Sequence, residues 1–139
     1  MKYGIFCVLL LIVGACKKEE TEEPKLEITV ENLLGTWEIY EATINGDVSQ
    51  GSCACYPFVG GYVSGIEFLD GSQSRLLPKD YPSYQIVHTW ELSIEDSQLQ
   101  FQSDDYDLTY KISKLSQQEL WLVDDRNGME DSYKFKKKQ

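Results

Sequence analysis

The sequence predicts an all-β domain, a small antiparallel up-and-down β-barrel of seven to eight strands. From Leu33 onward, apolar and polar residues alternate with a period of two, and no long window shows helical spacing. Turn-forming pairs such as Asn45-Gly46 and Asp70-Gly71 separate the alternating segments. Each strand would have one apolar face, and no predicted helix covers it. A barrel, or two packed sheets, buries these faces, and short turns favour the up-and-down barrel.

The strands follow from the alternation in chain order. The clearest one places Ile86, His88, Trp90, Leu92 and Ile94 on one face. Upstream we expect strands at 37–44 and 63–69, with a weak candidate at 73–77, and a long loop over Asn45–Gly61. Downstream, the alternation predicts strands around Leu99 and Phe101, from Tyr106 to Ile112, around Leu120 and Leu122, and around Tyr133 and Phe135.

Length and charge restrict the organisation and the function. A chain of 139 residues has room for one compact domain, which we place at residues 31–139. Its formal net charge of −10 argues against nucleic acid as a partner, because phosphate binding requires clustered cations. With one histidine and four cysteines, the sequence predicts neither a metal site nor a cofactor.

The first residues predict export. Residues 4–15 form an uncharged, mostly apolar run that is too short for a membrane span and typical of a signal-peptide core, so residues 1–15 are expected to be a signal peptide. The run ends in Val13-Gly14-Ala15-Cys16, which resembles a bacterial lipobox. That resemblance implies a palmitate-type lipid anchor on Cys16, which becomes the N-terminus after cleavage. The alternative is an ordinary secretory signal.

Residues 16–30 are predicted to be an acidic tether after the lipidated cysteine, because the stretch through Lys25 lacks apolar side chains. Lys18-Glu19-Glu20 resembles an export signal that sends some lipoproteins to the outer cell surface; the alternative is a plain spacer. We therefore expect a lipid-anchored protein of the outer membrane, exposed at the cell surface if the export signal operates.

Leu33-Leu34-Gly35-Thr36-Trp37 resembles the Gly-x-Trp opening of lipocalin-like domains, and the later strands follow the order found in small bacterial lipocalin-like lipoproteins. This resemblance implies that Trp37 plugs the closed end of the barrel. It also implies a lumen that is either filled or holds one small apolar ligand. The inward positions are expected to be Trp37, Ile39, Ile66, Phe68, Ile86, His88, Trp90, Leu108, Tyr110, Leu120, Leu122, Tyr133 and Phe135, with Leu92 and Ile112.

His88 is the polar member of the most apolar strand face. It could hold the polar end of a ligand, or it could be a core histidine whose nitrogen bonds a tyrosine or a backbone carbonyl. The sequence contains no Gly-x-Ser-x-Gly elbow that would supply a nucleophile, so we do not expect an enzyme.

Cys53 and Cys55 lie in the predicted 45–61 loop, outside the cytosol if the protein is exported. A local disulfide is the first interpretation, and Cu(I) binding by two thiolates is an alternative. The pair also faintly resembles that of copper-resistance, envelope-stress lipoproteins, which implies a sensing role. The loop itself is expected to overhang the barrel mouth as an aromatic lid, or to be an ordinary surface loop.

Two function classes result. The first is a lipid-anchored envelope module, expected to be monomeric, whose barrel binds a small hydrophobic ligand. The second is a filled barrel that acts as a structural or protein-interaction module and contacts another envelope protein.

Acidic clusters at 104–107 and 124–131 lie at predicted turns and lack the spacing of a calcium loop, so we interpret them as solvated hairpin tips.

Overall fold

The structure is a computed structural model, and it describes residues 23–50, 63–78, 86–102, 104, 107–125, 128 and 130–139. Within these residues a single-turn helix, α1 (Val30–Leu33), precedes the strands. The strands are β1 (Gly35–Ile44), β2 (Asp47–Gln50), β3 (Val63–Leu69), β4 (Gln73–Pro78), β5 (Ile86–Ser93), β6 (Gln98–Gln102), β7 (Asp107–Leu115), β8 (Glu119–Asp124) and β9 (Asp131–Lys137). The helix is too short to cross a membrane.

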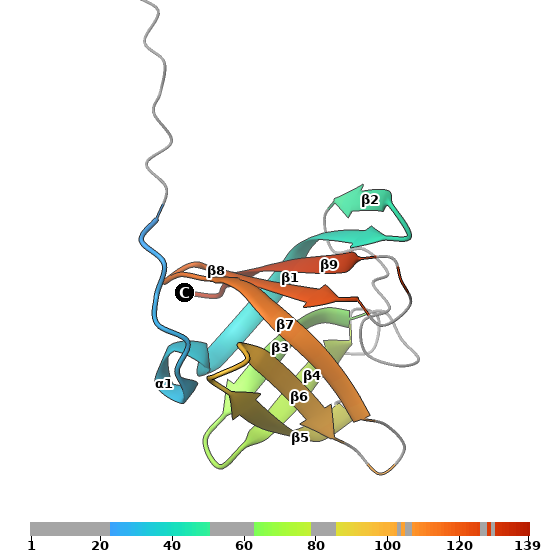
Figure 1. Ribbon diagram of the computed structural model, residues 1–139. Coiled ribbons are helices and arrows are strands. Elements are labelled where there is room, and N and C mark those ends of the chain that lie inside the picture. Colours follow the sequence, from blue (N-terminus) through green and yellow to red (C-terminus); the bar gives the residue numbers. More distant parts are fainter. Residues whose placement is uncertain are drawn as a thin grey trace, which may run out of the picture.

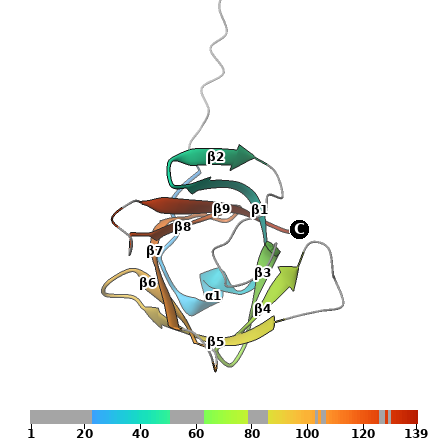
Figure 2. The same cartoon turned by 90° about the vertical axis from the view of Figure 1, so that its right-hand side faces the viewer.

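The strands form a closed antiparallel barrel. Consecutive strands pair from β3 to β9, β1 pairs with β3, and the β1–β9 pairing closes the ring (Figures 1 and 2). Eight strands belong to this ring, which confirms the predicted all-β barrel, including the weak strand at residues 73–77. Closure buries the apolar face of every strand and leaves no open edge within the ring.

β2 corrects the predicted loop over Asn45–Gly61. Residues 47–50 form a strand that pairs with residues 41–44 of β1 and lies outside the ring. Asn45 and Gly46 both have positive φ angles, of 52° and 85°, as a tight hairpin turn requires. The Asn-Gly pair therefore forms a hairpin turn, and residues 51–61 of the predicted loop lie outside the described part of the chain.

The barrel interior is packed with large apolar side chains. An aromatic series crosses it from Trp90 through Phe68, Phe101 and Tyr110 to Tyr133, with successive ring centroids 5.2 to 6.0 Å apart. β1 and β3 approach each other closely at Gly65, where an added Cβ would lie 2.3 Å from the carbonyl oxygen of Trp37. A glycine at this position is therefore a packing requirement.

Helix α1 and Trp37 stopper one end of the barrel. Leu33 and Trp37 are fully buried, and the Trp37 indole N–H donates to the Leu33 carbonyl oxygen at 2.7 Å. Thr29 caps the helix by accepting a hydrogen bond from the Asn32 amide. Figure 2 shows α1 within the outline of the ring of strands. Trp37 thus lies where the Gly-x-Trp resemblance implied.

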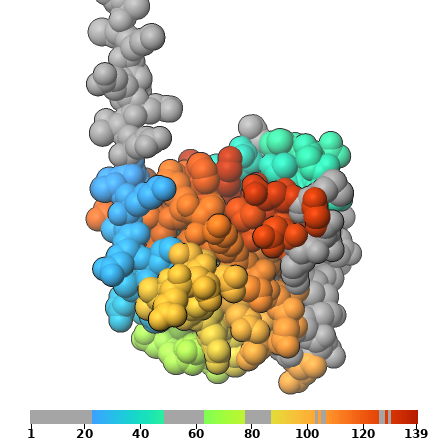
Figure 3. Space-filling view, in the orientation of Figure 1, coloured from blue at the N-terminus to red at the C-terminus, as the bar shows by residue number. Residues whose placement is uncertain are grey.

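The chain already packs against the barrel before residue 31. Leu26 and Ile28 contact the hydrophobic core, and the Leu26 amide donates to the Leu115 carbonyl oxygen at 2.7 Å. In the space-filling view this segment, in blue, lies against the orange strands (Figure 3). The last part of the predicted 16–30 tether therefore belongs to the folded unit, because its apolar residues cover the closed end.

The predicted apolar face of β5 is one residue too long. Ile94, expected on the same face as Trp90, is 58% exposed, because β5 ends at Ser93 and residues 94–97 turn into β6. Ser97 in that turn has a φ of 53°, and its carbonyl accepts from the Ile112 amide. Because of this turn, the alternation of inward and outward side chains along β5 stops before Ile94.

Candidate functional site

The predicted lumen residues lie on the inner face of the barrel. At most 8% of each side chain is exposed for Trp37, Ile39, Ile66, Phe68, His88, Trp90, Leu108, Tyr110, Leu120, Leu122, Tyr133 and Phe135. Ile86 is the first residue of β5, and its side chain lies outside the described part of the chain. Leu92 is half-buried against the core, and Ile112 is buried. The structure therefore brings the predicted set together.

The described interior is tightly packed, and the packing reaches the end opposite α1, where Phe101, next to the last residue of β6, also has no exposed surface. Trp37, Ile66, Leu120, Leu122 and Phe135 have no exposed surface, so no water-sized space adjoins them. Among the buried lumen residues, Leu108 is the most exposed at 8%, and it follows the first residue of β7; Leu92, near the other end of β5, is only half-buried.

That opposite end is the barrel mouth. The antiparallel order places there the residues Ile44, Val63, Pro78, Ile86, Gln102, Asp107, Asp124 and Asp131 at strand ends. The predicted lid, with Cys53 and Cys55, lies outside the described residues, as does Cys16, the predicted lipid-attachment residue. The disulfide, the Cu(I) site and the lipid anchor stay predictions.

Two polar side chains face each other inside the barrel. Ser74 on β4 and His88 on β5 are paired in register, so both side chains lie on the same face of the sheet. Ser74 is fully buried and His88 is 4% exposed. Neither Ser74 Oγ nor His88 Nε2 has a hydrogen-bond partner. The histidine therefore does not gain, at Nε2, the tyrosine or carbonyl partner expected of an ordinary core histidine.

Apolar side chains surround this pair. Phe68 is the register partner of Ser74 on β3, and Leu76 and Trp90 are the next inward residues along β4 and β5. Burial lowers the pKa of His88 from 6.5, so its imidazole is neutral near neutral pH. Ser74 and His88 are therefore two uncharged side chains with hydrogen-bonding atoms in an otherwise apolar part of the barrel wall.

Unlike Ser74 Oγ and His88 Nε2, the indole N–H groups of the two interior tryptophans are hydrogen-bonded. Trp37 donates to the Leu33 carbonyl, and Trp90 Nε1 donates to the Gln73 carbonyl at 2.9 Å. The Trp90 amide also donates to the Ser72 carbonyl at 2.9 Å, which holds β5 against the β3–β4 turn. These hydrogen bonds tie β5 to the start of β4 beside the Ser74–His88 pair.

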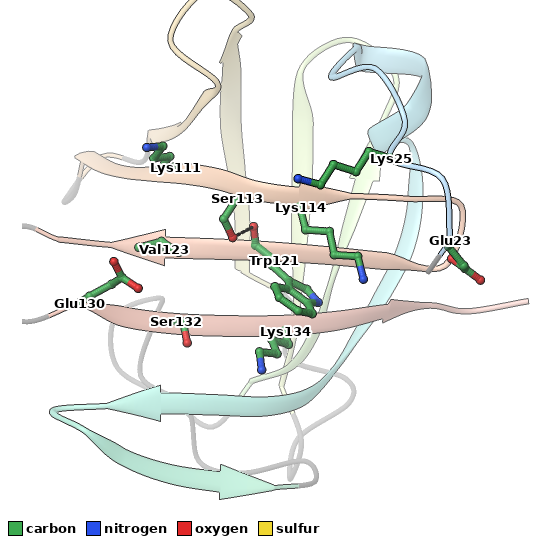
Figure 4. A pocket seen from close by; sticks show the side chains of 10 residues that line it. All are labelled: Glu23, Lys25, Lys111, Ser113, Lys114, Trp121, Val123, Glu130, Ser132 and Lys134. Atoms are coloured by element: carbon green, nitrogen blue, oxygen red, sulfur yellow. Dashed lines mark hydrogen bonds between the residues drawn. The ribbon is translucent and has the colours of Figure 1, made fainter. Parts of the chain in front are cut away.

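A second candidate region is a groove on the outer face of β7, β8 and β9, with a volume of about 600 Å³. Figure 4 shows its lining side chains, which come from these strands, the N-terminal segment and the residue before β9. They are Glu23, Lys25, Lys111, Ser113, Lys114, Trp121, Val123, Glu130, Ser132 and Lys134. The small side chains along the strands leave the space of the groove open, and charged side chains lie at its edges.

Trp121 lies between two lysines in this groove (Figure 4). The ammonium groups of Lys114 and Lys134 lie 4.6 and 4.7 Å from its ring centroid. Lys114 also pairs with Glu119, and Lys134 pairs with Glu41. The outward position of Trp121 follows from the alternation with Leu120 and Leu122, but the lysines meet it only through the cross-strand register.

Tyr40 and Glu119 extend this charged network along the barrel wall. The Tyr40 hydroxyl donates to Glu119 Oε1 at 2.8 Å. Burial, and then the neighbouring carboxylate, raise the pKa of Tyr40 to about 12. The hydrogen bond from Lys114 lowers the pKa of Glu119. These groups form a fixed ion-paired surface.

Ser74 was absent from the predicted lumen set. Its strand carries little alternation, and a serine gives no hydrophobic signal, so only the pairing of β4 with β5 places it inside. Leu76, Leu99 and Phe101 also line the interior. Among the described residues no group of three or more His, Cys, Asp or Glu side chains is arranged to hold a metal ion.

The sequence matches no protein-family model, and it matches no curated protein. Comparison with solved structures finds a lipocalin-like protein from Bacteroides uniformis, with 16% sequence identity and a TM-score of 0.50. The match covers 77% of this chain and 99% of that protein. At this identity the likeness concerns the fold alone, and it supports the observed architecture: this chain is an all-β, closed, eight-stranded barrel of the lipocalin-like type.

Proposed function

We propose that this chain is a lipid-anchored binding module of the bacterial cell envelope whose barrel holds one small apolar molecule. The observation that carries the proposal is the closed barrel itself, stoppered at one end by α1 and Trp37 and walled by apolar side chains. Eight-stranded barrels have the size at which the lumen either fills or holds one ligand. The single mouth then gives the ligand one route in.

The proposed anchor is the acylated Cys16, and the proposed location is the outer membrane. Six residues lie between Cys16 and Glu23, the first described residue, so the two are seven residue steps apart. Fully extended they reach roughly 25 Å, so the barrel would stay close to the bilayer surface. The N-terminal segment leaves the barrel at its closed end, where Leu26 binds Leu115. This arrangement points the mouth away from the anchor point.

The proposed role is non-catalytic, and the proposed state is a monomer. The one histidine is buried among apolar side chains beside Ser74. There it suits recognition of a ligand better than proton transfer to and from solvent.

The experiment is a fluorescence titration with 1-N-phenylnaphthylamine, an apolar probe that brightens in a dry site. The protein is the chain from residue 16 with Cys16→Ser, which keeps it unlipidated. Leu108→Trp fills the mouth side of the interior, and Val87→Trp, at an exposed position of β5, is the matched control. We expect binding that Leu108→Trp abolishes and Val87→Trp leaves intact, with both variants folded by circular dichroism. Binding that is unaffected by Leu108→Trp would refute a lumen site.

The outer groove favours a second candidate function, a module that contacts another envelope protein. Trp121 and its two flanking lysines supply the aromatic and cationic contacts that are common in protein interfaces. A photo-crosslinking residue placed at Ser132 in the groove should then give one discrete adduct in cells. The same residue at Val87, on another face, should give none; equal labelling at both sites would count against the groove.

A further inference from the structure

We propose that the groove face, the outer surface of β7, β8 and β9 around Trp121, lies against the anionic phosphate head groups of the membrane that holds the chain. This inference rests on the proposed function, because it requires the anchor at Cys16. It assigns the groove to a lipid surface, whereas the second candidate function assigns it to a protein. It also adds an orientation: the barrel lies on its side on the bilayer.

The first argument is the place from which the N-terminal tether leaves the barrel. Glu23, the first described residue, itself lines the groove, and its carboxylate accepts a hydrogen bond from the Ser116 hydroxyl at 2.8 Å. The Leu26 amide holds the same segment to the end of β7 through the Leu115 carbonyl. The remaining residues back to Cys16 span roughly 25 Å at full extension. Because this short tether starts at the edge of the groove face, that side of the barrel is the nearest one to the anchor.

The second argument is the distribution of cations over the barrel. The structure describes eight Lys and Arg residues, and seven of them are lysines of the N-terminal segment, of β7, of β9 and of the position that follows β9. The eighth, Arg75, belongs to β4, which lies opposite β8 in the ring. The whole chain has a formal net charge of −10. An anionic surface therefore attracts the side that carries the lysines and repels the rest of the molecule.

The third argument is the charge within the groove. Its lining contains four lysines and two acidic residues, Glu23 and Glu130. Two of these lysines, Lys25 and Lys111, have no ion-pair partner among the described residues. Head-group phosphates would give both ammonium groups charge-assisted hydrogen bonds. The attraction is screened within about 10 Å, so it acts only when the groove face is close to the bilayer.

The fourth argument is the aromatic side chain at the centre of this surface. Trp121 is half-buried, and Lys114 and Lys134 lie on either side of its ring (Figure 4). Tryptophan combines an apolar ring with a polar N–H group, and lysine combines an apolar stem with a charged end. Both are therefore suited to the boundary between water and lipid.

The test attaches the chain from residue 16 to vesicles and measures whether Trp121 becomes covered. With Cys53→Ser and Cys55→Ser, Cys16 is the only thiol of this chain, and a maleimide lipid coupled to it substitutes for the acyl anchor. The vesicles consist of phosphatidylcholine alone, or of equal parts phosphatidylcholine and phosphatidylglycerol. Acrylamide quenching reports on Trp121, because the two other tryptophans are buried and a Trp121→Phe variant supplies the background.

On vesicles with phosphatidylglycerol we expect the quenching constant of Trp121 to be about threefold lower than in the unattached chain. It should fall much less on phosphatidylcholine alone. Lys111→Glu should restore most of the quenching, and it breaks no ion pair among the described residues. Arg75→Glu makes the same change of charge on the opposite side of the ring and should leave Trp121 covered. Circular dichroism verifies that both variants are folded.

Two results would overturn the inference. One is quenching of Trp121 that is the same on both kinds of vesicle and in the unattached chain. If the photo-crosslinker at Ser132 then also captures one discrete protein in cells, the groove belongs to the second candidate function. The other is an equal effect of Lys111→Glu and Arg75→Glu, which would show a dependence on net charge and not on this face.

The anchor itself is tested separately, by the mass of the Cys16 peptide from the full chain isolated from bacterial membranes. An unacylated Cys16 would refute the anchor, and this inference with it. An acylated Cys16 together with an uncovered Trp121 on vesicles would refute this inference alone. Ligand binding in the barrel is measured with the fluorescent probe and does not depend on either result.

Discussion

The Trp37 indole N–H bonds the Leu33 carbonyl oxygen at 2.7 Å, and this contact joins the first strand to the helical turn that stoppers the barrel. Both residues have no exposed surface. The contact explains in physical terms why a Gly-x-Trp sequence begins this barrel: the indole fills the closed end and also satisfies a carbonyl at the end of α1.

Trp37→Phe should therefore destabilise the protein more than the loss of buried area alone predicts. The Leu33 carbonyl would remain buried without its partner, at a cost of about 1–3 kcal/mol. Urea unfolding followed by circular dichroism measures the change. Val87→Ala, at an exposed position, should stay within about 0.5 kcal/mol of the parent. A Trp37→Phe variant as stable as that control would contradict the role of this hydrogen bond.

Gly65→Ala should prevent close pairing of β1 and β3. The new Cβ would lie 2.3 Å from the backbone oxygen of Trp37, so the paired backbones of β1 and β3 would have to move apart, and we expect a loss of about 4 kcal/mol or more. Gly71→Ala is the control: nothing lies within 4 Å of its Cβ, and its φ of 76° should cost only about 1 kcal/mol. Thermal unfolding of both variants measures the two losses of stability. Equal losses would argue against the close approach of β1 and β3 at Gly65.

Acidification should destabilise the barrel through His88. In the unfolded chain the imidazole binds a proton near its ordinary pKa of 6.5, whereas burial lowers that pKa in the folded chain. Between the two pKa values the unfolded state holds more protons, so stability falls as pH falls, by at most about 1.4 kcal/mol per pH unit. Urea unfolding between about pH 7.5 and pH 5.5 should show this slope. It should be absent from His88→Gln, and a slope that persists there belongs to other groups.

Glu119→Gln should lower the pKa of Tyr40 from about 12, but not fully to its ordinary value of 10.0. Burial is the largest cause of the raised pKa and remains in the variant, while the negative charge of Glu119 is lost. Ultraviolet titration of tyrosinate, with Tyr40→Phe subtracted, measures the shift. An unchanged pKa would show that the Tyr40–Glu119 contact does not persist in solution.

Alternation was enough to predict the barrel, because burial of one face of each strand repeats the same two-residue pattern from Trp37 to Phe135. It could not predict where a strand ends. Ile94 continues the pattern in sequence but lies in a turn, and residues 47–50 form a strand that lies outside the ring.

The candidate sites could be located only from the pairing register of the strands. His88 was visible as a polar residue on an apolar face, but its opposite partner Ser74 is set by the β4–β5 register. Likewise, Lys114 and Lys134 are 20 residues apart in sequence and meet at Trp121 because β8 lies between β7 and β9. Such constellations depend on non-local pairing, which no local sequence pattern specifies.

The most direct test of the central claim, that the barrel holds a small apolar molecule, is native mass spectrometry of the chain from residue 16 with Cys16→Ser. Its mass is compared before and after denaturation, as purified and after incubation with 1-N-phenylnaphthylamine. The account predicts an added mass, equal to one ligand per chain, that disappears on denaturation. A folded chain that carries no added mass and takes up no probe would contradict it.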